Sequence, residues 1–231
     1  MKFDLLLFDL DGTLYDQDCG YEENVHSNIF KFMTETKGGK FDQITSISEA
    51  KIVWQPIFQK YNLTKRGLLA EGYKFNTTEY DNYIRQGAKE FIKRDTDLRI
   101  FLESLPQRKV IFTNAPEQSA NEILDLLGVK DLFETVLGSD FMGDNICKPE
   151  RAAFEKVLNH LNISDCRKVC YFEDSFQNLE EGGILGFSTV FIASTTLESE
   201  GRSEEELFKF NAVMKAKVGL SLRGQLPDLW Q

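Results

Sequence analysis

Five short hydrophobic runs limit most strongly how this chain can fold. Most of them are nearly continuous rather than alternating, and they are rich in β-branched or aromatic residues. Continuous runs of this kind are typical of strands in a parallel sheet that is covered on both faces. The predicted strands are residues 4–10, 109–113, 135–138, 168–172 and 189–192.

Segments with helical periodicity separate the later strands. Residues 116–127 and 149–161 each begin with a proline and carry apolar side chains at helical spacing. Gly128 directly follows the first segment and is expected to cap its C-terminus. This alternation of strands and helices predicts a doubly wound α/β sheet.

A long stretch with little strand signal follows the first strand. It spans about 95 residues, which is too long for an ordinary crossover. Its helical segments are residues 22–36, 47–61, 63–73 and 78–94. Pro56 is expected to kink or divide the second of these helices. We therefore predict a small all-helical domain over residues 15–95, inserted into an α/β core made of residues 1–14 and 96–231.

Composition excludes several classes of function. The chain has 27 Lys+Arg and 37 Asp+Glu, a formal net charge of −10, which argues against binding a nucleic-acid polymer. No apolar run approaches the length of a membrane span, and no secretory signal pattern opens the sequence. We expect a cytoplasmic location, with a nuclear one left open, and four reduced cysteines. With only His26 and His160, catalysis is expected to depend on carboxylates.

Two aspartates end the first predicted strand. Strand alternation places Asp9 and Asp11 on the same side, at the carboxyl edge of the sheet where open α/β folds bind ligands. Gly12 then permits a sharp turn. Carboxylates held this close repel each other unless a cation or a shared proton intervenes. Taken alone, the pattern also fits a simple turn that closes a strand.

Polar residues end the second strand and precede a later helix. Thr113 and Asn114 can donate to a phosphate oxygen at a strand end, although both are also ordinary turn and cap residues. Lys148 lies just before a helix start, where a cation has no structural advantage but would suit an anionic ligand. A solvated lysine is the alternative.

A second acidic pair ends the fourth strand. Glu173 and Asp174 offer hard oxygen ligands of the kind that Mg²⁺ prefers, and Ser175 and Asn178 follow closely. The alternative is that Asp174 or Ser175 only caps the next helix. Because all four polar groups occur at or near the same predicted sheet edge, we interpret them together as one site.

In this combination the sequence resembles the haloacid dehalogenase superfamily of aspartate-nucleophile phosphatases, which have a Rossmann-like core. The four motifs match at residues 8–13, 113–114, 148–149 and 173–178. The helical insert resembles the small cap of the first subfamily, and in that superfamily the cap usually selects the substrate. Within the superfamily the chain is similar to the pyrimidine 5′-nucleotidase branch of fungi and plants. That similarity rests on residues 13–15, 108–115, 146–149 and 227–230. Glu173 departs from the aspartate that this branch usually has.

The resemblance implies a role for each site residue. Asp9 would be the nucleophile that forms an aspartyl-phosphate, and Asp11 would be the general acid and base. Mg²⁺ would be held by Asp9, the backbone carbonyl of Asp11, Asp174 and Glu173, the last directly or through water. The phosphate oxygens would be bound by Thr113, Asn114 and Lys148. Ser175 and Asn178 would support the metal ligands.

We therefore predict a Mg²⁺-dependent phosphomonoester hydrolase that acts on pyrimidine mononucleotides such as UMP and CMP. Tyr15, Trp54 or Tyr80 are candidates for stacking on a base. The Glu173-Asp174 pair keeps open a sugar-phosphate or phosphoglycolate phosphatase or a phosphoglucomutase-like enzyme. A catalytically idle partner-binding protein is the alternative of another class. The expected partner is a small phosphorylated metabolite, with no nucleic-acid polymer and no membrane, and the chain is expected to be a monomer or a homodimer.

Overall fold

The computed structural model describes residues 2–193, 209–215 and 219–230, and it divides the chain into two compact units. One unit is Met1–Cys19 with Ile92–Gln231, and the other is Gly20–Phe91. The dividing points fall after Cys19 and before Ile92, whereas the sequence placed them after residue 14 and before residue 96. The charged segment 198–206 lies outside the described residues.

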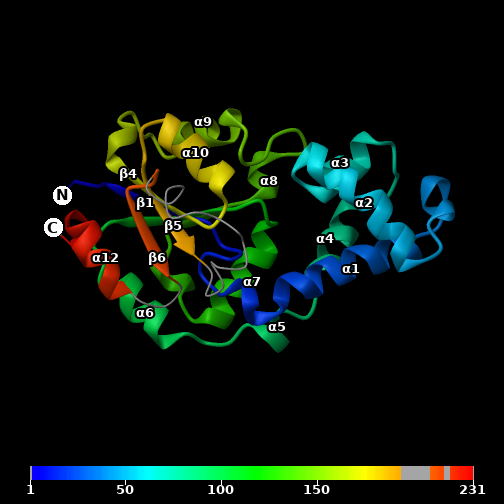
Figure 1. Cartoon of the computed structure of the whole chain (residues 1–231), viewed down its shortest axis with the longest axis horizontal. Coiled ribbons are helices and arrows are strands. Elements are labelled where there is room, and N and C mark those ends of the chain that lie inside the picture. The colour runs from blue at the N-terminus through cyan, green and yellow to red at the C-terminus, as the bar shows by residue number, and fades with distance from the viewer. Residues whose placement is uncertain (1, 194–208, 216–218, 231) are drawn as a thin grey trace. The chain divides into compact units, whose positions relative to one another are not determined.

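A six-stranded parallel sheet forms the first unit, with the strand order β3-β2-β1-β4-β5-β6 (Figure 1). The predicted α/β Rossmann-like fold is confirmed. The strands are β1 Leu5–Phe8, β2 Arg108–Phe112, β3 Thr135–Leu137, β4 Val169–Glu173, β5 Ser188–Ala193 and β6 Ala212–Lys215. The sequence predicted the first five of these strands but not β6.

The position of β1 in the sheet explains its sequence. It pairs with β2 on one side and β4 on the other, so that Phe8 lies in register with Ile111 and Phe172. All four β1 residues are buried, as a central strand covered on both faces requires. The carboxyl ends of β1, β2 and β4 consequently meet at one edge of the sheet.

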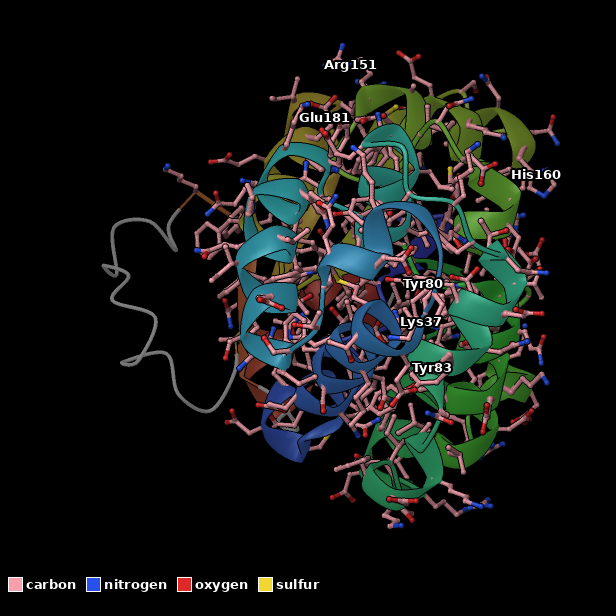
Figure 2. The ribbon with its side chains drawn as sticks, turned by 90° about the vertical axis from the view of Figure 1, so that its right-hand side faces the viewer. Lys37, Tyr80, Tyr83, Arg151, His160 and Glu181 are labelled. Atoms are coloured by element: carbon pink, nitrogen blue, oxygen red, sulfur yellow. The ribbon has the colours of Figure 1, made fainter. Side chains whose placement is uncertain are left out.

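Helices connect these strands. Among the residues that the structure describes, the α-helices of this unit are α6 Thr96–Glu103, α7 Glu117–Leu127, α8 Ser139–Met142, α9 Arg151–His160, α10 Phe176–Ile184 and α12 Gly219–Gln225. The 3-10 turns are η1 Gln17–Cys19, η3 Lys130–Leu132, η4 Cys166–Lys168 and η6 Pro227–Trp230. Gly128 ends α7 in the left-handed conformation, as predicted. Figure 2 shows Arg151 of α9 close to Glu181 of α10, and their side chains form an ion pair of 2.8 Å.

The last described residues dock on the α/β unit. Leu229 is fully buried, and its carbonyl accepts a hydrogen bond of 2.9 Å from Gln107. The indole of Trp230 donates to Ser104 at 3.0 Å. Leu229 and Trp230 of η6 are therefore held on the α/β unit. The four cysteines are free thiols, and none of the described helices is long and apolar enough to cross a membrane.

The second unit is all-helical, as predicted. Its helices are α1 Tyr21–Glu35, α2 Ile47–Tyr61, α3 Thr64–Ala70, α4 Thr77–Arg85 and α5 Ala88–Phe91, with the 3-10 turn η2 Gly39–Gln43. Pro56 was expected to kink or divide the second helix, and it does not divide it, since α2 runs through Pro56. The carbonyl that would have accepted from residue 56 belongs to Ile52, and that residue is 72% exposed. The fourth predicted helix is instead split at Gly87, which has a φ of 90°.

Aromatic side chains fill the core of the helical unit. Tyr80 is only 1% exposed and packs edge-on against Phe32, with ring centroids 5.0 Å apart. Trp54 stacks on Phe58 at 4.9 Å and donates to the Thr64 hydroxyl at 2.8 Å. Tyr80 thus belongs to the core, so the structure does not support the prediction that it stacks on a ligand base.

Candidate active site

Asp9 directly follows β1, at the edge where the carboxyl ends of three strands meet. Its backbone N–H donates to the carbonyl of Phe172 at 2.9 Å, which fixes the residue between β1 and β4. Its side chain is largely buried, with 6% of the residue exposed. The predicted nucleophile is therefore held rigidly by the sheet itself.

A buried lysine joins Asp9 to the acidic pair of β4. The Lys148 ammonium donates to Asp9 Oδ1 at 2.6 Å and to Glu173 Oε2 at 2.8 Å. It also donates to the Phe112 carbonyl at 2.8 Å, and the residue is only 2% exposed. The solvated-lysine alternative is excluded, because the side chain is directed inward onto two carboxylates.

The end of β2 positions this lysine. Asn114 Oδ1 accepts from the Lys148 backbone N–H at 2.9 Å, and Asn114 Nδ2 donates to the Lys148 carbonyl at 3.2 Å. The Lys148–Pro149 peptide bond is cis. Thr113 is buried, and its hydroxyl accepts from the Ala115 N–H at 3.1 Å. The Asn114 amide thus contacts the lysine backbone, a contact that the sequence did not predict.

Four hydrogen-bond donors surround Glu173. Its Oε2 accepts from the Lys148 ammonium, from the Tyr171 hydroxyl at 2.5 Å and from Asn178 Nδ2 at 2.9 Å. Its Oε1 accepts from the Ser175 N–H at 3.1 Å. Because Glu173 is only 1% exposed, these donors replace the water that the carboxylate loses on burial. Ser175 and Asn178 are therefore located where the sequence placed them, beside this acidic group.

Asp174 is anchored from the loop that follows β1. Thr13 Oγ1 donates to its Oδ1 at 3.3 Å, and Gln17 Nε2 donates to its Oδ2. Gly12 adopts a φ of 75°, and a Cβ atom at that position would lie 2.5 Å from Asp174 Oδ2. Gly12 is thus required both for its left-handed backbone and for the close approach of the aspartate.

Asp11 accepts a hydrogen bond from a nearby phenol. The Tyr15 hydroxyl donates to Asp11 Oδ1 at 2.5 Å. Tyr15 lies four residues after Asp11 on the same turn. Both residues are partly exposed, in contrast to Asp9 and Glu173. Asp11, the predicted general acid and base, therefore has a specific hydrogen-bond partner on its own loop.

The balance of charges perturbs the protonation of the site. Burial and the neighbouring charge of Glu173 raise the pKa of Asp9 to about 7, although Lys148 opposes this rise. Burial and Glu173 likewise raise the pKa of Asp174 well above its usual value. Burial acts to raise the pKa of Glu173 as well, but Lys148 holds it below the usual value. The pKa of Lys148 is itself raised by Asp9 and Glu173 despite burial, so its ammonium stays charged.

The donor set fits a divalent cation. Asp9, Glu173 and Asp174 each offer a carboxylate oxygen, and these atoms lie within 4.8 Å of one another. Three carboxylates face one ammonium, so a hard cation with oxygen ligands would relieve the excess negative charge. After burial, the charge of Glu173 is the next cause of the raised pKa of both Asp9 and Asp174.

The sequence did not single out four residues as parts of this site: Thr13, Gln17, Tyr15 as a partner of Asp11, and Tyr171. A signal existed for Tyr171, since it lies two residues before Glu173 on one strand and alternation puts both on the same side. No local signal marks Gln17, whose partner Asp174 lies 157 positions further along the chain.

The chain matches the family model of the haloacid dehalogenase-like hydrolases over residues 3–183. It therefore belongs to this family and is a hydrolase, in agreement with the class of enzyme predicted from its motifs.

Individual relatives share less than a quarter of their aligned residues with this chain. "Phosphate metabolism protein 8" of Saccharomyces cerevisiae is 23% identical over 199 residues, which cover 80% of this chain but only 60% of the yeast protein. Among solved structures, the putative HAD-hydrolase YfnB from Bacillus subtilis bound to magnesium has a TM-score of 0.62 at 16% identity, with 99% of both chains covered. A putative beta-phosphoglucomutase from Thermotoga maritima has a TM-score of 0.56 at 19% identity, covering 92% of this chain and 94% of that one. At these identities the solved structures show the fold alone.

Proposed function

We propose that this chain is a Mg²⁺-dependent phosphomonoester hydrolase that works through an aspartyl-phosphate on Asp9. The observation that carries the proposal is the buried Lys148 ammonium, which lies 2.6 Å from Asp9 and 2.8 Å from Glu173. A lysine and a cation site on either side of a carboxylate suit the binding of a phosphate dianion beside a negatively charged nucleophile.

In the first step Asp9 attacks the phosphorus of the ester. The bond from phosphorus to the ester oxygen breaks, its electron pair goes to that oxygen, and Asp11 supplies the proton that makes it an alcohol. In the second step water attacks the phosphorus of the aspartyl-phosphate and gives a proton to Asp11. The bond to Asp9 then breaks, and inorganic phosphate and the free carboxylate are regenerated.

The other site residues assist these two steps. Asp9, Asp174, the Asp11 carbonyl and Glu173 would hold Mg²⁺, which polarises the phosphoryl oxygens when bound. Lys148 neutralises charge on the transferred group, and Thr113 and Asn114 are proposed to bind its oxygens. Since the Asn114 side chain also holds the Lys148 backbone, we assign it the additional task of positioning that lysine.

Pyrimidine mononucleotides are the proposed substrates. The proposal is supported by the resemblance of residues 13–15, 108–115, 146–149 and 227–230 to the pyrimidine nucleotidase branch. The yeast relative bears a name linked to phosphate metabolism, which agrees with phosphomonoester chemistry. Glu173 in place of aspartate favours a second candidate, a sugar-phosphate phosphatase or a phosphoglucomutase-like enzyme.

Phosphate release from a panel of esters tests both candidates. The panel contains UMP, CMP, AMP, phosphoglycolate and glucose phosphates, each with Mg²⁺ and with EDTA. We expect release from UMP and CMP that EDTA abolishes. A strong preference for sugar phosphates would refute the nucleotidase assignment, and no release from any ester would favour a binding protein.

The nucleophile is tested by Asp9→Asn. Without a carboxylate at the end of β1, no aspartyl-phosphate can form, so turnover should fall by at least about a thousandfold. Asp125→Asn is the matched control, because Asp125 of α7 is exposed and pairs with Lys130 of η3. Near-normal activity of Asp9→Asn would show that the nucleophile is another residue.

A further inference from the structure

We propose that Tyr15 is a positioning residue whose hydroxyl fixes the rotation of the Asp11 carboxyl group for proton transfer to the leaving group. This inference rests on the proposed phosphatase function, in which Asp11 is the general acid and base. It adds a residue that acts through Asp11.

The backbone turn after β1 brings the two side chains together. The turn starts at Leu10. The Leu10 carbonyl accepts from the N–H of Thr13 at 3.2 Å and from the N–H of Leu14 at 3.0 Å. Gly12 in the left-handed region makes this tight turn possible. Tyr15 therefore returns beside Asp11 instead of continuing away from the sheet edge.

Anchors on both sides hold Tyr15 in place. Thr13 precedes it and Gln17 follows it, and both donate to the carboxylate of Asp174. Leu14 is 5% exposed and packs into the core. Since Thr13 and Gln17 are bound to Asp174 and Leu14 is buried, the phenol ring has little freedom to leave Asp11.

A short hydrogen bond joins the two side chains. The Tyr15 hydroxyl donates to Asp11 Oδ1 at 2.5 Å, so this oxygen is used as an acceptor. A donor held on one carboxyl oxygen restricts the rotation of the whole group. Asp11 is therefore kept in one orientation for the transfer of a proton to the leaving group and from water.

Tyr15→Phe removes this hydroxyl and keeps the ring. Asp11 would then lose the donor that fixes its rotation, and proton transfer to the leaving oxygen would become less efficient. The loss should depend on the leaving group, because an alkoxide needs the proton whereas 4-nitrophenolate leaves without it. A residue that only stabilised the fold would affect both kinds of ester equally.

The experiment compares kcat/KM for benzyl phosphate and 4-nitrophenyl phosphate, two esters of similar size, in the full chain with Mg²⁺. For Tyr15→Phe we expect a loss of about 10- to 100-fold on benzyl phosphate and of less than about threefold on 4-nitrophenyl phosphate. Tyr83→Phe is the matched control, since Tyr83 of the helical unit, labelled in Figure 2, donates its hydroxyl to Glu35 at 2.6 Å. That variant should leave the ratio of the two kcat/KM values unchanged.

The two possible failures are distinguishable. If the unmodified chain hydrolyses both esters and Tyr15→Phe reduces both equally, or neither, the role of Tyr15 is refuted and the phosphatase function stands. If the unmodified chain releases no phosphate from either ester or from the nucleotide and sugar-phosphate panel, both proposals are overturned.

Discussion

Replacing Lys148 with methionine should reverse the sign with which Glu173 makes the stability of the α/β unit depend on pH. Methionine fills the volume of the lysine stem and removes only the charged end. Asp9 and Glu173 would then remain buried without the ammonium that now lies 2.6 and 2.8 Å from them. Glu173 is only 1% exposed, so water cannot replace the lost partner.

The sign of this pH dependence follows from the protonation of Glu173. In the unmodified chain Lys148 holds its pKa below the usual value, so Glu173 contributes stability above the ordinary carboxyl range and loses it as the pH falls. Without Lys148, burial raises that pKa instead. The group then takes up a proton in the folded state, and stability is lost as the pH rises.

The loss of stability expected for Lys148→Met has two parts. Removing one partner of a buried ion pair destabilises a protein by about 3–5 kcal/mol when the other partner stays charged. Each additional proton bound by the folded state changes the free energy of unfolding by about 1.4 kcal/mol per pH unit. The destabilisation by Lys148→Met should therefore grow by about 2–3 kcal/mol between pH 5.5 and pH 7.5.

Urea unfolding in EDTA at the two pH values measures this change. The chain has two tryptophans, and the Trp54→Phe background leaves Trp230 as the only one, so that fluorescence follows the α/β unit. Lys109→Met is the matched control, since Lys109 is also buried but donates to the carbonyls of Leu105 and Gln107. Its effect should be the same at both pH values. If the loss caused by Lys148→Met were also independent of pH, the carboxylates would not depend on Lys148 for their charge.

Three further changes test the loop contacts and the metal ligands. Asp174→Asn should raise the Mg²⁺ concentration needed for half-maximal activity, and an unchanged requirement would remove Asp174 from the metal ligands. Gly12→Ala should destabilise the chain by about 1–2 kcal/mol and displace Asp174, because its φ is 75° and its Cβ would lie 2.5 Å from Oδ2; an unaltered melting temperature would contradict this. Glu117→Ala should reduce the unfolding free energy by about 1–3 kcal/mol while the Mg²⁺ requirement stays the same, since its carboxylate accepts from the N–H groups of Gly138, Asp140 and Phe141. Urea unfolding checks the Glu117 change, and a loss below about 0.5 kcal/mol would show that those bonds are dispensable.

The strand ends could be read from the sequence because their signal is local. An apolar run that stops at Asp9, or at Glu173 and Asp174, marks the edge of a parallel sheet, and the carboxyl ends of neighbouring strands must meet there. Pairing of β1 with both β2 and β4 then brings Asp9 and Glu173 close enough to share Lys148. The sheet topology therefore explains why these predicted residues meet.

The contacts that orient the site could not be read in the same way. Asn114 was predicted from its place after a strand, yet its amide binds the backbone of Lys148, 34 positions away. Thr13 reaches Asp174 across 161 positions. Such pairings depend on side-chain rotamers and on the path of a turn, and neither leaves a periodic pattern in the sequence.

The loop after β1 connects the two halves of the proposed chemistry. Thr13 and Gln17 hold Asp174, a proposed metal ligand, while Tyr15 between them holds Asp11, the proposed acid and base. Because one short turn carries all three contacts, a shift of that turn moves the metal ligand and the proton donor together. A substitution that displaces the turn, such as Gly12→Ala, should therefore change the Mg²⁺ requirement and the preference for acidic leaving groups at once. Tyr15→Phe leaves both anchors of Asp174 in place and should change only the leaving-group preference.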